Sequence, residues 1–215
     1  MHTNGELATE TERVRKIQDR DAARYDRQIA IPERILFGDG RRWVCDRARG
    51  DVLELAVGTA RNLPFYPRDV TLTGIELSDE MLAIGRRRAQ QLGRSADLRL
   101  GDAQALEFPD ESFDTVVCTL SLCTIPYPRR AVAEARRVLR PGGRMLLLEH
   151  VRSPVRAVRV VEQLLDPLAV RFAADHLTRE PLEYLRGQGF KIERVERSKW
   201  GIVERIAARK PPGAR

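Results

Sequence analysis

The sequence reads VLELAVGTA at residues 52–60, an apolar run that passes directly into small residues. The apolar run predicts a buried strand over residues 51–55, and Ala56 to Ala60 predict a tight turn after it. Gly58 gives that turn its conformational freedom, while Ala56 and Ala60 keep side-chain bulk out of the way. In an open α/β sheet, the loop after the first strand lies at the switch point where ligands bind. This stretch therefore predicts both the start of a sheet and the place of its ligand.

Strands and helices alternate through the rest of the chain. We expect strands at residues 70–75, 96–100, 113–118 and 144–150, and helices from Ser78 to near Gly93 and at 129–139, 154–174 and 179–187. Two final strands, 191–195 and 202–208, are spaced as in a hairpin. The predicted fold class is α/β, a doubly wound, mostly parallel, seven-stranded sheet with a C-terminal antiparallel hairpin strand.

The first 49 residues precede the sheet and predict a helical lid. A surface helix is expected at residues 10–29, and Pro32 is expected to open a second helix that runs toward Arg49. We therefore divide the chain into an N-terminal helical lid, residues 1–49, and one domain, residues 50–210. A length of 215 residues suits one well-buried core.

The charge pattern argues against nucleic acid as a partner, although the formal net charge is +7. Only four of the 38 basic residues are lysines, and the basic residues alternate with 31 acidic ones. No run is long and apolar enough for stable membrane insertion, and residues 1–20 lack a signal-peptide pattern. We expect a cytoplasmic protein with a small-molecule acceptor, and the sequence leaves the oligomeric state open.

The three cysteines, Cys45, Cys118 and Cys123, predict free thiols. An odd count without a secretion signal argues against a disulfide framework, and zinc-type pairing with histidines is missing. Because free cysteine is among the most often buried residue types, we expect Cys118 and Cys123 to be packing residues. We therefore expect no metal.

Acidic residues follow the predicted strands where a nucleoside would need acceptors. Glu76 ends the second strand, 18 positions beyond Gly58, where a carboxylate can accept both ribose hydroxyls. After the third strand, Asp102 can accept from an adenine amino group, and Ala103 leaves room for the ring. The Gly-x-Gly-x-x-Gly pattern of nicotinamide enzymes is absent from the sequence.

The turn after the first strand and the acidic residues after the second and third strands, taken in this order, resemble the S-adenosylmethionine pocket of class I methyltransferases. The resemblance covers most of residues 51–149 and includes RVLRPGG at 137–143, a segment that recurs in the small-molecule and quinone branch. It implies S-adenosyl-L-methionine as cofactor. Glu54 could accept hydrogen bonds near the amino acid portion of that molecule, and Tyr25 of the lid could close over its sulfonium by cation–π attraction, the alternative being a surface tyrosine. The remaining cofactor residues that we expect are Thr59, Leu77, Met81, Thr119 and Leu120.

One departure from the family concerns the turn, where glycine is usual at positions 56 and 60. If either position needs a positive φ, alanine there is strained by about 1 kcal/mol or more, and cofactor affinity drops. The two alanines also suggest an alternative of another class, a non-catalytic pseudo-methyltransferase that serves as a binding module.

The segment at residues 113–123 narrows the choice of acceptor. It reads TLSL at 119–122, where DNA and RNA amino-methyltransferases carry an Asp/Asn-Pro-Pro-aromatic motif for a flipped base. Together with LEHV at 148–151, QLLDP at 163–167 and LTRE at 177–180, it resembles the methyltransferase-like alkyl-thiol S-methyltransferases of animal microsomes and their bacterial relatives. The chain lacks their hydrophobic N-terminal anchor, and Asp175 stands where they carry cysteine, which places a carboxylate near the expected substrate pocket.

The chemistry implied is an in-line displacement, so the enzyme mainly holds two reactants at near-attack distance. A thiol is already a few per cent thiolate at pH 7, whereas a phenol or an amine benefits more from a base. His150 is our candidate base, with His176 behind it and Asp166 or Arg179 as orienting groups. These residues also have structural interpretations. His150 can be a hydrogen-bonded histidine at a strand end, Asp166 a residue that ends a helix, and Arg179 an ion-pair partner of Glu183.

The sequence therefore predicts an S-adenosylmethionine-dependent methyltransferase that acts on a small lipophilic acceptor. A thiol is the first choice of acceptor. O-, C- or N-methylation of a quinol, a phenol or a phospholipid amine is the alternative.

Overall fold

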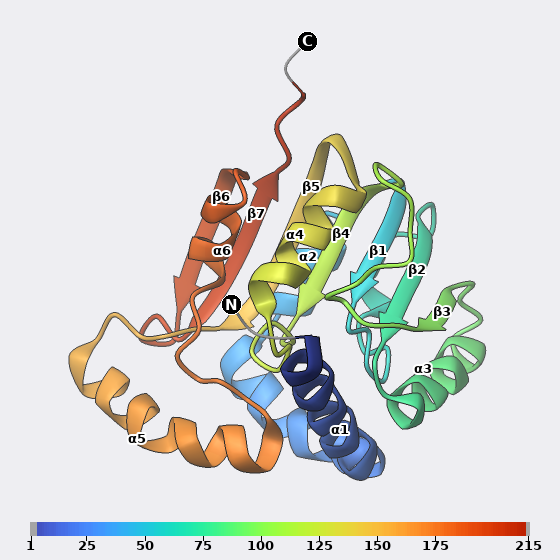
Figure 1. The fold of residues 1–215 in the computed structure, drawn as a ribbon. Coiled ribbons are helices and arrows are strands. Elements are labelled where there is room, and N and C mark those ends of the chain that lie inside the picture. The colour runs from blue at the N-terminus through green and yellow to red at the C-terminus, as the bar shows by residue number, and fades with distance from the viewer. Residues whose placement is uncertain (1–3, 214–215) are drawn as a thin grey trace.

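The computed structural model describes residues 4–213 and contains one seven-stranded sheet, in the order β3-β2-β1-β4-β5-β7-β6 (Figure 1). Strands β1 to β5 are parallel, and β7 runs antiparallel to both β5 and β6. This confirms the doubly wound, mostly parallel sheet and its C-terminal hairpin. The strands are β1 (Asp51–Leu55), β2 (Thr71–Glu76), β3 (Asp97–Leu100), β4 (Phe113–Thr119), β5 (Leu139–His150), β6 (Lys191–Ser198) and β7 (Val203–Arg209).

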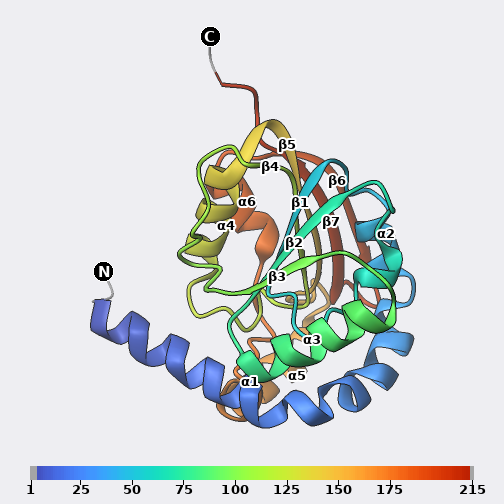
Figure 2. The same ribbon diagram turned by 90° about the vertical axis from the view of Figure 1, so that its right-hand side faces the viewer.

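Helices cover both faces of the sheet (Figure 2). On one face lie α2 (Gly40–Cys45) and α3 (Asp79–Gln91), and on the other α4 (Pro128–Val138) and α6 (Pro181–Gly187). Each face has its own buried apolar cluster, and the central strands β4 and β5 contribute to both. Ser78 caps α3, because its hydroxyl accepts a hydrogen bond from the Met81 amide at 3.1 Å.

The N-terminal region differs from the two helices that the sequence predicts. It forms one long helix, α1 (Asn4–Pro32), so Pro32 ends a helix instead of opening one. A π-helical turn, η1 (Glu33–Phe37), follows directly and is closed by a bond from the Gly38 amide to the Glu33 carbonyl at 3.1 Å. Gly38 then adopts φ 53°, which stops the helix, and α2 begins two residues later. Gly38, and not Pro32, sets the break.

Helix α1 crosses the carboxyl edge of the sheet, and α5 (Arg156–Ala173) lies at the same edge (Figure 1). Side-chain hydrogen bonds fasten α1 to three successive loops: Gln104 to Thr11 at 3.1 Å, Ser78 to Asp19 at 2.5 Å, and Thr59 to Asp26 at 2.7 Å. The helix therefore lies like a lid over the loops at this edge of the sheet, as expected. The domain boundary at residue 49 remains a prediction. Over residues 4–213, no helix has the length and apolar character needed to cross a membrane.

Candidate active site

The turn after β1 is held in an unusual backbone conformation. Ala56, Gly58 and Ala60 have φ values of 50°, 55° and 59°, so the turn uses the left-handed region at three alternate positions. The Val57 amide donates to the Ile75 carbonyl at 2.8 Å, which ties the turn to β2. Two of the three left-handed positions carry alanine, where this conformation costs about 1 kcal/mol or more. Ala56 and Ala60 therefore both have the positive φ at which an alanine is strained.

Glu76, at the end of β2, organises the turn from the other side. One carboxylate oxygen accepts from the Gly58 amide at 2.8 Å, and the other accepts from the Leu77 and Ser78 amides at 2.9 and 3.0 Å. Burial raises the pKa of Glu76 above its ordinary value, and the three backbone donors oppose that rise. The carboxylate is thus fixed beside the turn and has further acceptor capacity toward a ligand.

A cavity of about 490 Å³ opens between this turn, α1 and α5. It takes in Ala56, Gly58 and Glu76, together with Tyr25, Met81, Leu120 and His150, all of which the sequence singles out. A smaller cavity of about 20 Å³ adjoins it and is lined by Leu77, Asp102 and Ala103. The two cavities share the walls formed by Gln18, Ala56, Glu76 and Thr124. Together they form one elongated site along the carboxyl ends of β1 to β5.

Gln18 is a residue that the sequence analysis misses, and it bears on what the site can hold. It lies on α1 and lines both cavities, and among the described residues its buried side-chain oxygen has no hydrogen-bond partner. A buried acceptor without a partner is costly unless a ligand donates to it. With the carboxylates of Glu76 and Asp102, this oxygen forms an acceptor-rich wall that fits a ligand carrying hydroxyls, an amino group and positive charge.

Four of the expected cofactor residues lie behind the cavity wall instead of in it. Glu54 is buried and accepts from the Asn62 amide and the Tyr66 hydroxyl, both at 2.8 Å, and burial raises its pKa to about 7. Thr119 accepts from Asn62 and from Arg41 at 3.0 and 3.1 Å. These bonds link β1 and β4 to the segment that follows the turn.

The other two residues behind the wall belong to the turn itself. Thr59 donates to Asp26 of α1, and the buried Ala60 packs where α3 approaches the turn at Gly85. Their contacts fix the turn between α1 and α3. In this structure Glu54, Thr59, Ala60 and Thr119 are therefore residues that position the cavity wall.

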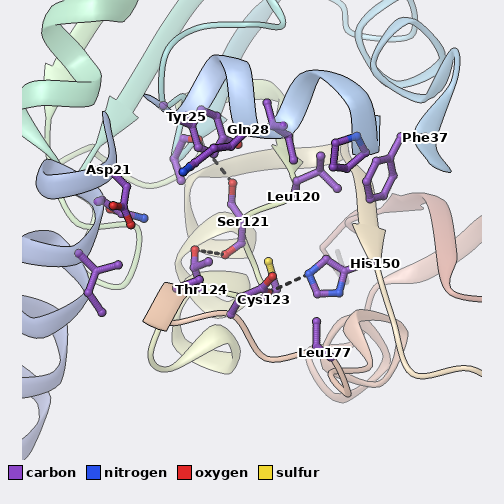
Figure 3. Close-up of a pocket in the computed structure, with 18 of the residues that line it drawn as sticks. Asp21, Tyr25, Gln28, Phe37, Leu120, Ser121, Cys123, Thr124, His150 and Leu177 are labelled. Carbon is purple, nitrogen blue, oxygen red and sulfur yellow. Dashed lines mark hydrogen bonds and ion pairs between the residues drawn. The ribbon is translucent and has the colours of Figure 1, made fainter. Parts of the chain in front are cut away.

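A second part of the cavity lining, where a methyl acceptor is expected, is built around His150, which ends β5. Its Nε2 atom lies 2.9 Å from Oδ1 of Asp175, and the Cys123 thiol lies beside this pair (Figure 3). Burial alone lowers the pKa of His150, but the hydrogen bond and charge of Asp175 outweigh burial and raise it above the ordinary value. Asp175 thus lines the pocket, as expected from its position, and it is the orienting partner of His150.

Cys123 and the ligand atoms around it could also hold a metal ion. One atom each from Cys123, His150 and Asp175 lies within 4.8 Å of the others, a group found in the described part of the chain. Burial raises the pKa of the Cys123 thiol far above its usual value, with the charge of Asp175 adding to the rise. The thiol therefore stays protonated at neutral pH, which disfavours metal binding, since thiolate is the ligand form. All three cysteines are buried free thiols, as predicted.

Asp166, His176 and Arg179 lie in or near the segment that carries Asp175, but outside the cavity lining. The Asp166 carboxylate accepts from the Leu177 amide at 2.7 Å, and the Arg179 guanidinium donates to the carbonyls of Leu122 and Ile125. These contacts hold the loop from α5 to α6 against the end of β4. In this structure Asp166 and Arg179 therefore support the pocket indirectly.

Glu149 is a second residue that the sequence analysis misses. It is fully buried, and one of its oxygens accepts from the Ser121 and Leu122 amides at 3.1 and 3.0 Å. These bonds fix the loop after β4, in which Leu120 has a φ of 53°. The available signal is an acidic residue that directly follows the buried run 145–148, where a charge is costly without partners.

Comparisons with known proteins agree with this geometry. Residues 53–147 match the family model described as a methyltransferase domain. The human thiol S-methyltransferase TMT1A is 30% identical over 190 residues, which cover 83% of this chain and 77% of that protein. The phosphatidylethanolamine N-methyltransferase of Cereibacter sphaeroides is 42% identical over 118 residues, but this match spans only 58% of that protein and 54% of this chain.

A solved structure extends the likeness to nearly the whole fold. The S-adenosylmethionine-dependent methyltransferase of Thermotoga maritima, described as a possible histamine N-methyltransferase, superposes with a TM-score of 0.70. It is 22% identical, and the match covers 91% of this chain and 99% of that one. The chain belongs to the S-adenosylmethionine-dependent methyltransferases. Its cofactor is S-adenosylmethionine. The hydrogen-bond acceptors of Gln18, Glu76 and Asp102 would suit the hydroxyl and amino groups of that molecule.

Proposed function

We propose that this methyltransferase transfers the methyl group to the sulfur of a small lipophilic thiol. The observation that carries the proposal is the His150–Asp175 pair, which lies in the acceptor half of the cavity. Around it the wall is mainly apolar, with Phe37, Leu120, Val151, Leu177 and Ile202. Such a cavity suits an acceptor that has an apolar body and one weakly acidic group.

His150 is the proposed general base, and Asp175 is its positioning residue. The Asp175 carboxylate accepts a hydrogen bond from Nε2–H, which leaves Nδ1 as the nitrogen that takes the thiol proton. When bound, S-adenosylmethionine supplies an activated methyl group on a sulfonium sulfur. The acceptor sulfur would take that methyl group as the sulfonium released it as a neutral thioether, and His150 would take the acceptor's proton. Tyr25 and Gln28 of α1 form the opposite wall (Figure 3) and limit access of water.

The matches to other methyltransferases support a thiol acceptor more than a lipid amine. A match over 83% of 215 residues must include β5 and most of α5, so the likeness to TMT1A extends to the acceptor end of the cavity. The match to the phospholipid enzyme is of higher identity but covers 54% of the chain. A phospholipid amine is therefore the second candidate, favoured by that identity.

The test is release of S-adenosylhomocysteine from S-adenosylmethionine over a panel of acceptors. The panel contains alkyl and aryl thiols, hydroquinones, small amines and vesicles of phosphatidylethanolamine. Turnover confined to thiols is the expected result. Turnover on the vesicles alone would replace this proposal with phospholipid N-methylation, and cofactor binding without any turnover would favour a non-catalytic binding module.

A further inference from the structure

Helix α5 exposes its large apolar side chains to solvent, which is the reverse of an ordinary surface helix. Six large apolar side chains spaced three and four residues apart are exposed along it, with Leu164 at 72% and Phe172 at 60%. The set comprises Val160, Val161, Leu164, Leu165, Leu168 and Phe172. None of the residues of α5, which the structure describes in full, is buried. A surface helix normally faces such a stripe to the core, so the stripe on α5 indicates that something else covers it.

The acidic side chains of α5 point the other way. Glu162 lines the cavity and accepts from the Ser153 amide at 2.9 Å, and Asp166 accepts from the Leu177 amide. The exposed charged residues that α5 itself places beside the apolar stripe are Arg156 and Arg171, near the two ends of the helix. The outward face of α5 is therefore apolar with a positive border.

Two neighbouring segments extend this face. The β6–β7 turn carries Trp200, which is 71% exposed and adjoins the start of α5, since the Ser153 hydroxyl donates to the Trp200 carbonyl at 2.7 Å. Lys199, beside it, adds another exposed positive charge. Across the cavity mouth, Ile31 and Ile35 are exposed next to Pro32 and Leu36, which line the cavity. Exposed apolar side chains thus border the cavity on both sides.

We propose that this surface, the outward face of α5 with Trp200 and Lys199, docks on the surface of an anionic lipid bilayer. An amphipathic helix with a basic border lies in the plane of such a surface, where its apolar face enters the region between headgroups and acyl chains. The cavity then opens toward the bilayer, from which a lipophilic acceptor enters. This surface goes beyond the proposed acceptor chemistry and does not depend on whether the acceptor is a thiol.

Charge favours a bilayer over a second copy of the chain. In a two-fold dimer formed through antiparallel α5 helices, Arg156 of each copy would approach Arg171 of the other. The outward face of α5 offers no carboxylate to offset that repulsion, because Glu162 and Asp166 face inward. Anionic headgroups supply the missing negative charge.

The test uses the full chain and sedimentation with phosphatidylcholine vesicles, with and without phosphatidylglycerol. We expect binding to the anionic vesicles that weakens as salt is raised. Leu164→Glu should lower that binding about tenfold, because it removes apolar contact and adds a negative charge at the surface. The matched control is Leu92→Glu, an exposed leucine at the end of α3, and binding should stay unchanged. Calorimetric binding of S-adenosylmethionine checks that each variant is folded.

Trp200 provides an independent readout. The chain has two tryptophans, and Trp43 is buried, so a blue shift of fluorescence on adding anionic vesicles reports on Trp200 and should vanish in Trp200→Phe. Equal binding to neutral vesicles without salt dependence would overturn the assignment of an anionic surface. A dimer that Leu164→Glu dissociates, without vesicle binding, would overturn the proposal in favour of a second copy. Neither result depends on turnover, so failure here is distinct from failure of the proposed reaction.

Discussion

The two ends of the cavity are built in different ways. At the cofactor end, main-chain hydrogen bonds fix the key side chain, as the amides of Gly58, Leu77 and Ser78 fix Glu76. At the acceptor end, His150 and Asp175 come from separate elements and meet only in the folded chain. The first arrangement is held by the main chain, whereas the second depends on one pair of side chains. The predictions below test this difference.

The largest expected effect is on cofactor binding. Glu76→Ala removes the carboxylate that orders the turn and that is expected to accept both ribose hydroxyls. Hydrogen bonds to a charged group contribute about 1.5–3 kcal/mol each, so losing two of them predicts about a 10³-fold weaker Kd for S-adenosylmethionine. Isothermal titration calorimetry measures this Kd.

Glu80→Ala is the control for that measurement, because Glu80 is an exposed acid in the first turn of α3. It should leave the Kd unchanged. A folded Glu76→Ala protein that binds the cofactor within threefold of the parent would show that the ribose contact lies elsewhere.

The next effect concerns catalysis alone. His150→Ala should lower kcat with an alkyl thiol by about 10²-fold, because the base is lost, while the Kd for S-adenosylmethionine stays constant. The loss should be smaller with a more acidic aryl thiol, which is already largely thiolate at neutral pH. Steady-state release of S-adenosylhomocysteine measures both.

His176→Ala is the matched control, since His176 lies outside the cavity lining. Equal losses for the two histidine variants, or the same loss with both thiols, would mean that His150 does not act as a base.

A third prediction uses the pH dependence of the reaction. Only the neutral form of His150 accepts a proton, so kcat/KM should rise with pH through a pKa above the ordinary value of about 6.5, as Asp175 raises it. Asp175→Asn removes that charge and should move the inflection toward acid. The pair stabilises the protonated histidine, so its contribution to folding is complete below about pH 6.5 and is lost as pH rises through the raised pKa.

The profile of Asp166→Asn is the comparison for that shift, because the Asp166 carboxylate bonds to the Leu177 amide and not to His150. Its inflection should stay at the parent value. An unshifted inflection in Asp175→Asn would assign the titration to another group.

The difference between the two ends also explains what could be predicted from the sequence. The strands and the turn after β1 follow from local patterns, apolar runs ended by small residues, and the structure places them within a few residues of expectation. Pro32 was misjudged because a proline is best tolerated in the first turn of a helix, whereas here the helical backbone continues through it and ends at Gly38, which has a positive φ.

At the acceptor end, sequence reasoning reached single residues but not their pairing. Asp175 was expected near the substrate pocket, yet its bond to His150 spans 25 positions and depends on how the loop after α5 folds back onto β5. Gln18 and Glu149 were missed for a similar reason. Each is one polar residue within an ordinary helix or strand pattern, and only its buried surroundings give it meaning.

The smallest expected effect returns to the strained turn. Ala56→Gly removes the strain of a left-handed alanine, which is about 1–2 kcal/mol. Glycine also gives the unfolded chain more conformational entropy, which lowers stability by about 0.5–1 kcal/mol. We therefore expect the free energy of unfolding to rise by about 0.5–1 kcal/mol. Ala60 has the same backbone conformation, but its methyl group is buried, and losing that burial costs about 0.8 kcal/mol, so Ala60→Gly should be nearly neutral. Urea unfolding without cofactor compares the two variants. Equal gains would mean that the buried methyl group of Ala60 contributes nothing, and no gain at position 56 would mean that the turn relaxes without strain.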